Sequence, residues 1–290
     1  MSELLPGALR DALEGALGTS VVAARPVGGG DVAVAYALTL RDGTPVSAKT
    51  HASAPPGFFA TEASGLAWLR AAGAVPVPEV LAVSDDRPNF LVLEWVESGR
   101  PHATTDADLG RALAALHRAG ARCFGREDRR TTGSRGLPNE PTDTWVACYR
   151  DNRLRPLAAL AARERALPAG VIDDLLRVAG RLEEIGGPPE PPARLHGDLW
   201  AGNRMVDRDG RSWLIDPAAH GGHREFDLAM MRLFGGFGAD CFAAYAEAHP
   251  LAPGWEERVP LHQIAPLVVH AVKFGGGYRR AAQEAIERYV

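Results

Sequence analysis

The 290-residue chain has little cysteine, no excess of basic residues and no long apolar segment. Cys123, Cys148 and Cys241 are widely spaced and form no C-x-x-C pair, which argues against a disulfide framework or a redox motif. The 32 basic and 36 acidic residues give a net charge of −4, so there is no general attraction to nucleic acid. No run approaches the ~18 apolar residues of a spanning helix, and no signal peptide is recognisable. We therefore expect a cytoplasmic protein with no nucleic-acid or membrane partner.

The most informative segment is residues 195–203, where Asp198 lies five positions before Asn203 and Asp216 follows thirteen positions later. In kinases, a loop of the form H-x-D-x-x-x-x-N supplies the catalytic base, and a carboxylate beyond a short hairpin holds magnesium. We predict that Asp198 accepts the proton of the attacking hydroxyl and that Asn203 and Asp216 bind Mg²⁺ on ATP. A loop with an Asx turn and no chemistry is the alternative.

A kinase also needs a lysine on a strand and a glutamate on the following helix, and the N-terminal part of the chain contains candidates for both. Residues 21–27, 32–40 and 45–50 have the composition of strands, and an Asp-Gly turn separates the last two. Lys49 lies near the end of the third strand, and Glu62 lies early in a predicted helix over residues 58–69. We expect Lys49 to bridge the α- and β-phosphates and Glu62 to hold it in place. A solvated lysine at a strand edge is the alternative.

Two further segments are predicted to contact the nucleotide because of their positions. Gly28, Gly29 and Gly30 lie between the first two strands, where glycines allow backbone N–H groups to approach phosphate closely. This run is not the G-x-G-x-x-G of protein kinases, and a plain flexible hairpin explains it almost as well. The mostly apolar strand over residues 90–96 ends in Glu94, Trp95 and Val96, which we assign to the hinge that binds adenine.

The overall pattern predicts an α+β, bilobal, protein-kinase-like fold. Residues 1–96 form a small β-rich lobe that begins with an amphipathic helix, and residues 97–290 form a larger, mainly helical lobe. In the large lobe, residues 109–120 read as a helix whose His117 is a packing residue. Residues 261–290 close the chain with helices that Gly275–Gly277 interrupt.

Two polar groupings are not expected to bind nucleic acid or metal. Arg126, Arg129, Arg130 and Arg135 are interrupted by acids and read as a solvated loop. His220 and His223 look like half of a metal site, but no second pair stands at zinc-site spacing.

In several sequence motifs the chain resembles the fructosamine kinase (ketosamine 3-kinase) family, a branch of the aminoglycoside-phosphotransferase and protein-kinase-like superfamily. The similar segments are residues 196–203, 215–218, 222–229 and 234–237, together with Trp145, Tyr149 and Arg153-Leu154. The resemblance implies transfer of phosphate from ATP to the C3 hydroxyl of ketosamines, either small molecules or adducts on proteins. The unstable product then decomposes and frees the amine.

The resemblance also implies roles for further residues. Trp200 is similar to the family's aromatic wall against the sugar amine, and His223 falls in a family motif assigned to the substrate. His196 and Asp227 are assigned to structural support, with Asp227 bracing the catalytic loop through backbone N–H groups. A monomer is expected. The preference between ribulosamines and fructosamines stays open.

Two alternative functions also stay open at this point. One is a phosphotransferase for another small molecule, such as an aminoglycoside or a choline-like alcohol. The other is a nucleotide-binding module without catalysis, although no expected catalytic residue is missing.

Overall fold

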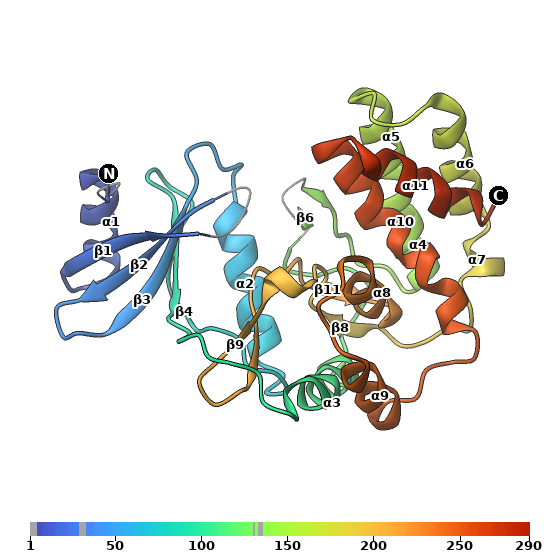
Figure 1. The fold of residues 1–290 in the computed structure, drawn as a ribbon. Coiled ribbons are helices and arrows are strands. Elements are labelled where there is room, and N and C mark those ends of the chain that lie inside the picture. Colours follow the sequence, from blue (N-terminus) through green and yellow to red (C-terminus); the bar gives the residue numbers. More distant parts are fainter. Residues whose placement is uncertain (1–4, 29–32, 130, 133–135) are drawn as a thin grey trace.

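The computed structural model describes residues 5–28, 33–129, 131–132 and 136–290, which fold into two lobes joined side by side (Figure 1). The N-lobe is built on a five-stranded antiparallel sheet of order β1-β2-β3-β5-β4. Its strands are β1 (Val21–Val27), β2 (Val34–Leu40), β3 (Pro45–Thr50), β4 (Val80–Ser84) and β5 (Phe90–Glu94). Its helices are α1 (Gly7–Leu17) and α2 (Phe58–Arg70).

Strand β5 is apolar throughout because both of its faces are covered. Phe90 and Val92 pack in a core with the buried leucines of α1, whereas Leu91 and Leu93 pack in a different core with α2. Successive side chains of a strand point to opposite faces, so α1 and α2 must cover opposite sides of the sheet.

The C-lobe is mainly helical, with short strand pairs around the catalytic loop (Figure 1). Its helices are α3 (Thr105–Arg118), α4 (Trp145–Tyr149), the π-helical η1 (Arg150–Leu154), α5 (Arg155–Arg163), α6 (Ala169–Gly180), α7 (Leu182–Ile185), the 3₁₀ turn η2 (Ala201–Asn203), α8 (Glu225–Phe234), α9 (Ala239–Ala248), α10 (Trp255–Phe274) and α11 (Gly277–Glu287). The pairs are β6 (Thr131–Thr132) with β7 (Leu137–Pro138), β8 (Ala193–Leu195) with β11 (His220–Gly222), and β9 (Arg204–Val206) with β10 (Ser212–Leu214).

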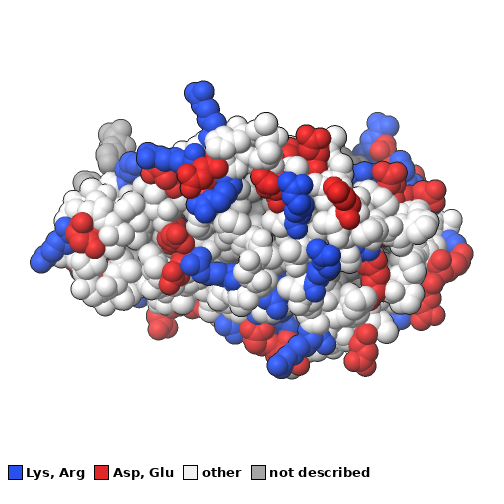
Figure 2. All heavy atoms as spheres, turned by 90° about the horizontal axis from the view of Figure 1, so that it is seen from below, with Lys and Arg blue, Asp and Glu red and all other residues white. Residues whose placement is uncertain are grey.

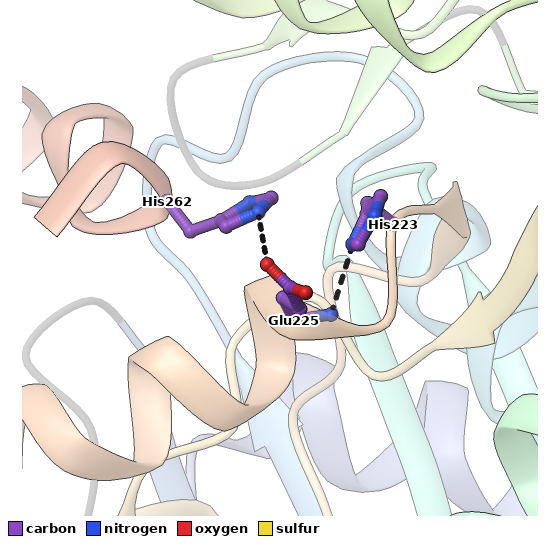
Figure 3. A group of neighbouring side chains, drawn as sticks. All are labelled: His223, Glu225 and His262. Carbon is purple, nitrogen blue, oxygen red and sulfur yellow. Dashed lines mark hydrogen bonds and ion pairs between the residues drawn. The ribbon is translucent and has the colours of Figure 1, made fainter. Parts of the chain in front are cut away.

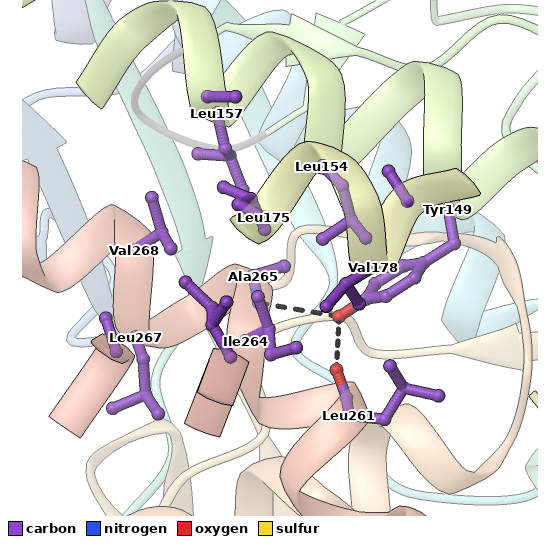
Figure 4. Close-up of a cluster of buried hydrophobic side chains, with 14 of the residues drawn as sticks. Tyr149, Leu154, Leu157, Leu175, Val178, Leu261, Ile264, Ala265, Leu267 and Val268 are labelled. Atoms are coloured by element: carbon purple, nitrogen blue, oxygen red, sulfur yellow. Dashed lines mark hydrogen bonds between the residues drawn. The ribbon is translucent and has the colours of Figure 1, made fainter. Parts of the chain in front are cut away.

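Tyr149 ties the helical core together by satisfying backbone groups of α10 (Figure 4). Its hydroxyl donates to the carbonyl oxygen of Leu261 at 2.8 Å and lies 3.4 Å from that of His262. Pro266, which follows His262 by four residues, lacks the N–H that would have bonded to the His262 carbonyl. The single phenol proton is donated to Leu261, so the hydroxyl lies beside the gap that Pro266 leaves but does not replace the missing bond. Burial raises the pKa of Tyr149 above its ordinary value.

The core that contains Leu91, Leu93 and α2 continues from one lobe into the other and supports the candidate site. It includes Leu66 of α2, Leu113 of α3 and Leu228 of α8, all fully or almost fully buried. It also contains Leu199, directly after Asp198, and Leu214, two residues before Asp216. The catalytic loop and the hairpin beyond it are thus anchored to the same apolar cluster as the N-lobe helix.

The predicted α+β, two-lobed architecture is confirmed, while several boundaries differ. Helix α3 begins at Thr105 rather than at residue 109, because its first turn carries Asp106 and Asp108 in place of apolar residues. The helix dipole favours acidic residues in the first turn of a helix. A search for apolar residues at helical spacing does not detect such a turn. The second strand begins at Val34, and Val32 lies outside the described residues. We propose the lobe division after residue 96, between β5 and α3.

On the face seen in Figure 2, basic and acidic side chains are interspersed, and neither sign of charge dominates. In the part of the chain that the structure describes, no helix combines the length and apolar character needed to cross a membrane.

Candidate active site

The catalytic loop is held by a buried carboxylate from α8. The N–H of His196 donates to Asp227 Oδ2 at 2.7 Å, and the N–H of Gly197 donates to Asp227 Oδ1 at 2.9 Å. Gly197 has a φ of +81°, and a Cβ there would lie 2.1 Å from the carbonyl oxygen of Ala218. Only glycine fits between Asp227 and Ala218 in this conformation. The backbone directly before Asp198 is therefore fixed from both sides.

Asp227 is in turn paired with His117, on α3. His117 Nε2 lies 3.3 Å from Asp227 Oδ2, and its Nδ1 lies 2.8 Å from the hydroxyl oxygen of Tyr245, on α9. Burial opposes ionisation of Asp227, but the hydrogen bond from His117 and the charges of the neighbouring histidines outweigh it and keep the pKa below its usual value. The packing role predicted for His117 therefore includes a polar contact.

Asp198 and Asn203 are joined across the loop. Asn203 Nδ2 donates to the backbone oxygen of Asp198 at 2.8 Å and approaches its Oδ2 at 3.2 Å. Burial raises the pKa of Asp198 to about 6, with smaller contributions from the charges of Asp216 and Asp227 and an opposing hydrogen bond from Asn203. Asp198 is thus a carboxylate of raised basicity, which suits a general base near neutral pH.

Lys49 connects the N-lobe to the metal carboxylate predicted from the sequence. Its Nζ lies 2.8 Å from Glu62 Oε1 and also contacts Asp216 Oδ1. Burial lowers the pKa of Lys49, but attraction to these two carboxylates outweighs burial and raises it overall. Asp216 itself has a φ of +55°, an unfavourable conformation for a residue other than glycine. The fold therefore brings Lys49, Glu62, Asn203 and Asp216 together around Asp198.

The remaining predicted nucleotide residues lie at the ends of β1 and β5 in the N-lobe. Gly28 is exposed directly after β1, and Gly29 and Gly30 lie outside the described residues. The Glu94 carboxylate accepts the N–H of Glu79 at 3.1 Å, and the Trp95 indole donates to Glu97 Oε2 at 3.2 Å. Both side chains have partners within the protein, and Val96 is buried. Contact of this segment's backbone with adenine stays a prediction.

Trp200 projects from the catalytic loop with 41% of its surface exposed. Its ring packs edge-on against Phe234, 6.1 Å between centroids, and Phe234 lies 5.0 Å from His270. His270 continues to Phe274 at 5.5 Å and to Tyr278 at 5.0 Å. We call these five side chains the aromatic row. One sequence signal points to this row: Phe274 and Tyr278 flank the glycines at 275–277, a run that by itself predicts only a helix break.

His223, which the resemblance assigns to the substrate, is buried in the C-lobe. It is 2% exposed, and its ring packs against Trp145 and His262. Figure 3 shows it beside Glu225 and His262, and ligand atoms of the three lie within 4.8 Å of one another. However, Arg258 donates to both oxygens of Glu225, and His223 Nδ1 already accepts the Glu225 N–H at 3.3 Å. We interpret the group as a charge-paired part of the core.

The prediction of a solvated arginine loop is wrong for Arg126. Its guanidinium is buried, bonds to Asp128 at 2.7 Å and packs 4.5 Å from the centroid of the Trp68 ring. Arg194 packs against the same ring at 4.7 Å. A planar guanidinium stacks on an indole face, an arrangement that counting charges along the sequence does not reveal. Arg130 and Arg135 lie outside the described residues.

This fold and the group around Asp198 define a kinase-like phosphotransferase. A thermostable mutant of an aminoglycoside phosphotransferase has the same fold, with a TM-score of 0.61 and 16% identity over 96% of this chain and 97% of that one. More specifically, residues 8–290 match the family model described as fructosamine kinase, and the chain belongs to this family.

Individual relatives agree with the family assignment. A probable ketoamine kinase of Synechocystis sp. is 36% identical over 80% of this chain and 78% of that protein. A chloroplastic protein-ribulosamine 3-kinase of Oryza sativa subsp. indica is 30% identical over 94% of this chain and 80% of that protein. A solved structure from Thermobifida fusca, provisionally named fructosamine-3-kinase, is 38% identical with a TM-score of 0.90, over 98% of this chain and 99% of that one.

The raised pKa of Asp198 predicts the acidic limb of the pH profile. A base must be deprotonated to act, so kcat/KM should fall as the pH drops below about 6 and level off above it. The measurement is the initial rate at low acceptor concentration between pH 4.5 and 8.5, with Trp200→Ala as a control that should keep the same inflection. An inflection near 4, the ordinary aspartate range, would contradict the assignment.

Asp227→Asn should lower both the stability of the protein and its kcat. The amide would place an N–H group against a backbone N–H and leave a buried donor unsatisfied, which should lower the free energy of unfolding by roughly 2–4 kcal/mol. Urea unfolding measures this loss, and kcat should fall at temperatures where the variant is still folded. Unchanged stability and kcat would show that the loop does not need this brace.

Proposed function

We propose that this kinase transfers the γ-phosphoryl group of ATP to the C3 hydroxyl of ketosamines. The observation that carries the proposal is the assembled group of Lys49, Glu62, Asp198, Asn203 and Asp216, with the exposed Trp200 two residues from the base. The names of the relatives, ketoamine kinase and protein-ribulosamine 3-kinase, support this acceptor class over aminoglycosides or choline.

On the nucleotide side, Lys49 is suited to bind the phosphates because Glu62 holds its ammonium group. The carboxylate of Asp216 and the amide oxygen of Asn203 are the oxygen donors that Mg²⁺ prefers, and Asp216 keeps about a third of its side chain exposed. Bound Mg²⁺ would neutralise charge on the phosphates. Asp216, which contacts Lys49 in this structure, would hold the ion together with Asn203.

On the acceptor side, the C3 hydroxyl oxygen attacks the γ-phosphorus and its proton passes to Asp198. The bond between the γ-phosphorus and the bridging oxygen breaks, and ADP leaves. Asn203 orients the carboxylate of Asp198 for this step. The apolar face of the sugar packs against Trp200, which places one hydroxyl at the base. The ketosamine 3-phosphate then decomposes and frees the amine, so the reaction leads to deglycation.

A panel of acceptors tests the proposal. ADP formation should be rapid with ribulosamines and fructosamines and slow with kanamycin and choline, and amine and phosphate should appear slowly afterwards. Asp198→Asn should lower kcat by ~10²–10⁴ while leaving ATP binding nearly intact, because only the proton acceptor is removed. A stable product, or robust turnover of an aminoglycoside alone, would favour the alternative phosphotransferase.

Trp200→Ala should impair positioning of the acceptor without affecting the binding or hydrolysis of ATP. Loss of the aromatic surface should reduce kcat/KM for a ketosamine by roughly 10²-fold, since misplacing the acceptor is costly, and should leave slow ATP hydrolysis without acceptor unchanged. Trp255→Ala is the matched control: it lies at the opposite end of α10 from the aromatic row. Equal losses for both variants, or none for Trp200→Ala, would count against the assignment.

A further inference from the structure

The turn between α8 and α9, residues 235–238, lies directly against the catalytic loop. We call it the glycine turn, because three of its four residues are glycine and the first two have φ values of +69° and +86°. A Cβ on Gly236 would lie 2.3 Å from the Cβ of Ala201, the residue after Trp200. Phe234, directly before the turn, packs edge-on against the Trp200 ring. The turn therefore touches the catalytic loop at the residue next to the proposed acceptor wall.

One carboxylate of α3 anchors the glycine turn. Asp106, in the first turn of α3, accepts the N–H of Gly238 through Oδ2 at 2.7 Å. Its Oδ1 accepts from Arg204 Nη2, also at 2.7 Å. Among the residues that the structure describes, no other side chain hydrogen-bonds to the backbone of the glycine turn. Because glycines restrict their own backbone least, the position of the turn depends on this contact.

The second partner of Asp106 is held independently of the turn. Arg204 directly follows Asn203, and its backbone pairs with Leu214 in the β9–β10 ladder. Its guanidinium is buried and lies 5.5 Å from the centroid of the Phe237 ring, within the glycine turn. Asp106 therefore joins the turn to a strand that leaves the catalytic loop and is already fixed by its own hydrogen bonds.

The Trp200 ring lies between the catalytic loop and the residue that leads into the turn. On the loop side, a Cβ on Gly202 would lie 2.2 Å from the indole, so the ring covers the Gly202 backbone. On the other side its neighbour is Phe234. A displaced turn would carry Phe234 away and leave the indole free to change rotamer. Asp198 would stay in place, because Asp227 holds the backbone before it.

We propose that Asp106 is a positioning residue for the acceptor: by anchoring the glycine turn, it keeps Trp200 in the orientation against which the ketosamine packs. The inference rests on the proposed function, because that function makes Trp200 the acceptor wall. Asp106 and Arg204 lie outside the segments that resemble the family, so this anchor is a feature of the present chain.

Asp106→Asn tests the anchor with almost no change in shape. The amide keeps one acceptor oxygen but turns an N–H group toward the second donor, so one of the two bonds is lost. With ribulosyl-lysine as acceptor, kcat/KM should fall about tenfold, mainly through KM for the acceptor, because its orientation is lost. KM for ATP and the slow ATP hydrolysis without acceptor should stay at the wild-type values.

Asp108→Asn is the matched control. Asp108 lies in the same first turn of α3, is exposed and pairs with Arg111, so its loss removes the same favourable helix-dipole contribution without touching the glycine turn. Its kinetics should equal those of the wild type, and melting temperatures of all variants should be compared. An equal loss in both variants would assign the effect to α3 itself and overturn the role of Asp106.

A double variant shows whether Asp106 acts through Trp200. Asp106→Asn combined with Trp200→Ala should have the kcat/KM of Trp200→Ala alone, within about twofold, because the ring that the anchor positions is already gone. Gly236→Ala, which displaces the turn from its other side, should reproduce the acceptor-specific loss.

Three results overturn the role of Asp106 and leave the proposed function intact. They are an unchanged kcat/KM in Asp106→Asn, a parallel rise in its KM for ATP, and a further tenfold loss in the double variant. A wild-type enzyme that turns over no ketosamine overturns the proposed function, and this inference with it.

Discussion

The site depends on one buried carboxylate that holds two backbone N–H groups. Asp227 lies on α8, remote in sequence from the loop, and fixes the backbone of His196 and Gly197 immediately before Asp198. A carboxylate without solvent is stable only if its oxygens are fully hydrogen-bonded, and here the loop supplies those bonds together with His117. The requirement is mutual: the loop needs the carboxylate for its shape, and the carboxylate needs the loop to remain charged.

Local motifs were sufficient to predict which polar side chains the fold brings together; their roles in catalysis stay predictions. Lys49, Glu62, Asp198, Asn203 and Asp216 are recognisable because each stands at a fixed distance from a strand end, a turn or another motif residue. The structure brings all five together. The same reasoning predicted the two lobes, because strands cluster before residue 96 and helical periodicity dominates after it.

The parts that were missed depend on contacts between distant segments. The aromatic row joins the catalytic loop to the ends of α8 and α10, which lie up to about seventy positions further along the chain. Arg126 is buried because Trp68, from the other lobe, covers its guanidinium. His223 belongs to a recognisable motif, yet the side chain faces Trp145 and His262 in the core. A motif identifies a residue's neighbours in sequence, whereas exposure is decided by what packs against it.

The shared core between the lobes bears on how the enzyme can be controlled. Helix α2, which carries Glu62, packs with Leu199 and Leu214 in one cluster, and Gly65 lies so close to Pro217 and Ala219 that a Cβ there would be 3.3–3.4 Å from their side chains. Moving this helix outward would open an apolar core that includes the catalytic loop. Switching by displacement of this helix, a common means of silencing protein kinases, is therefore unfavourable here.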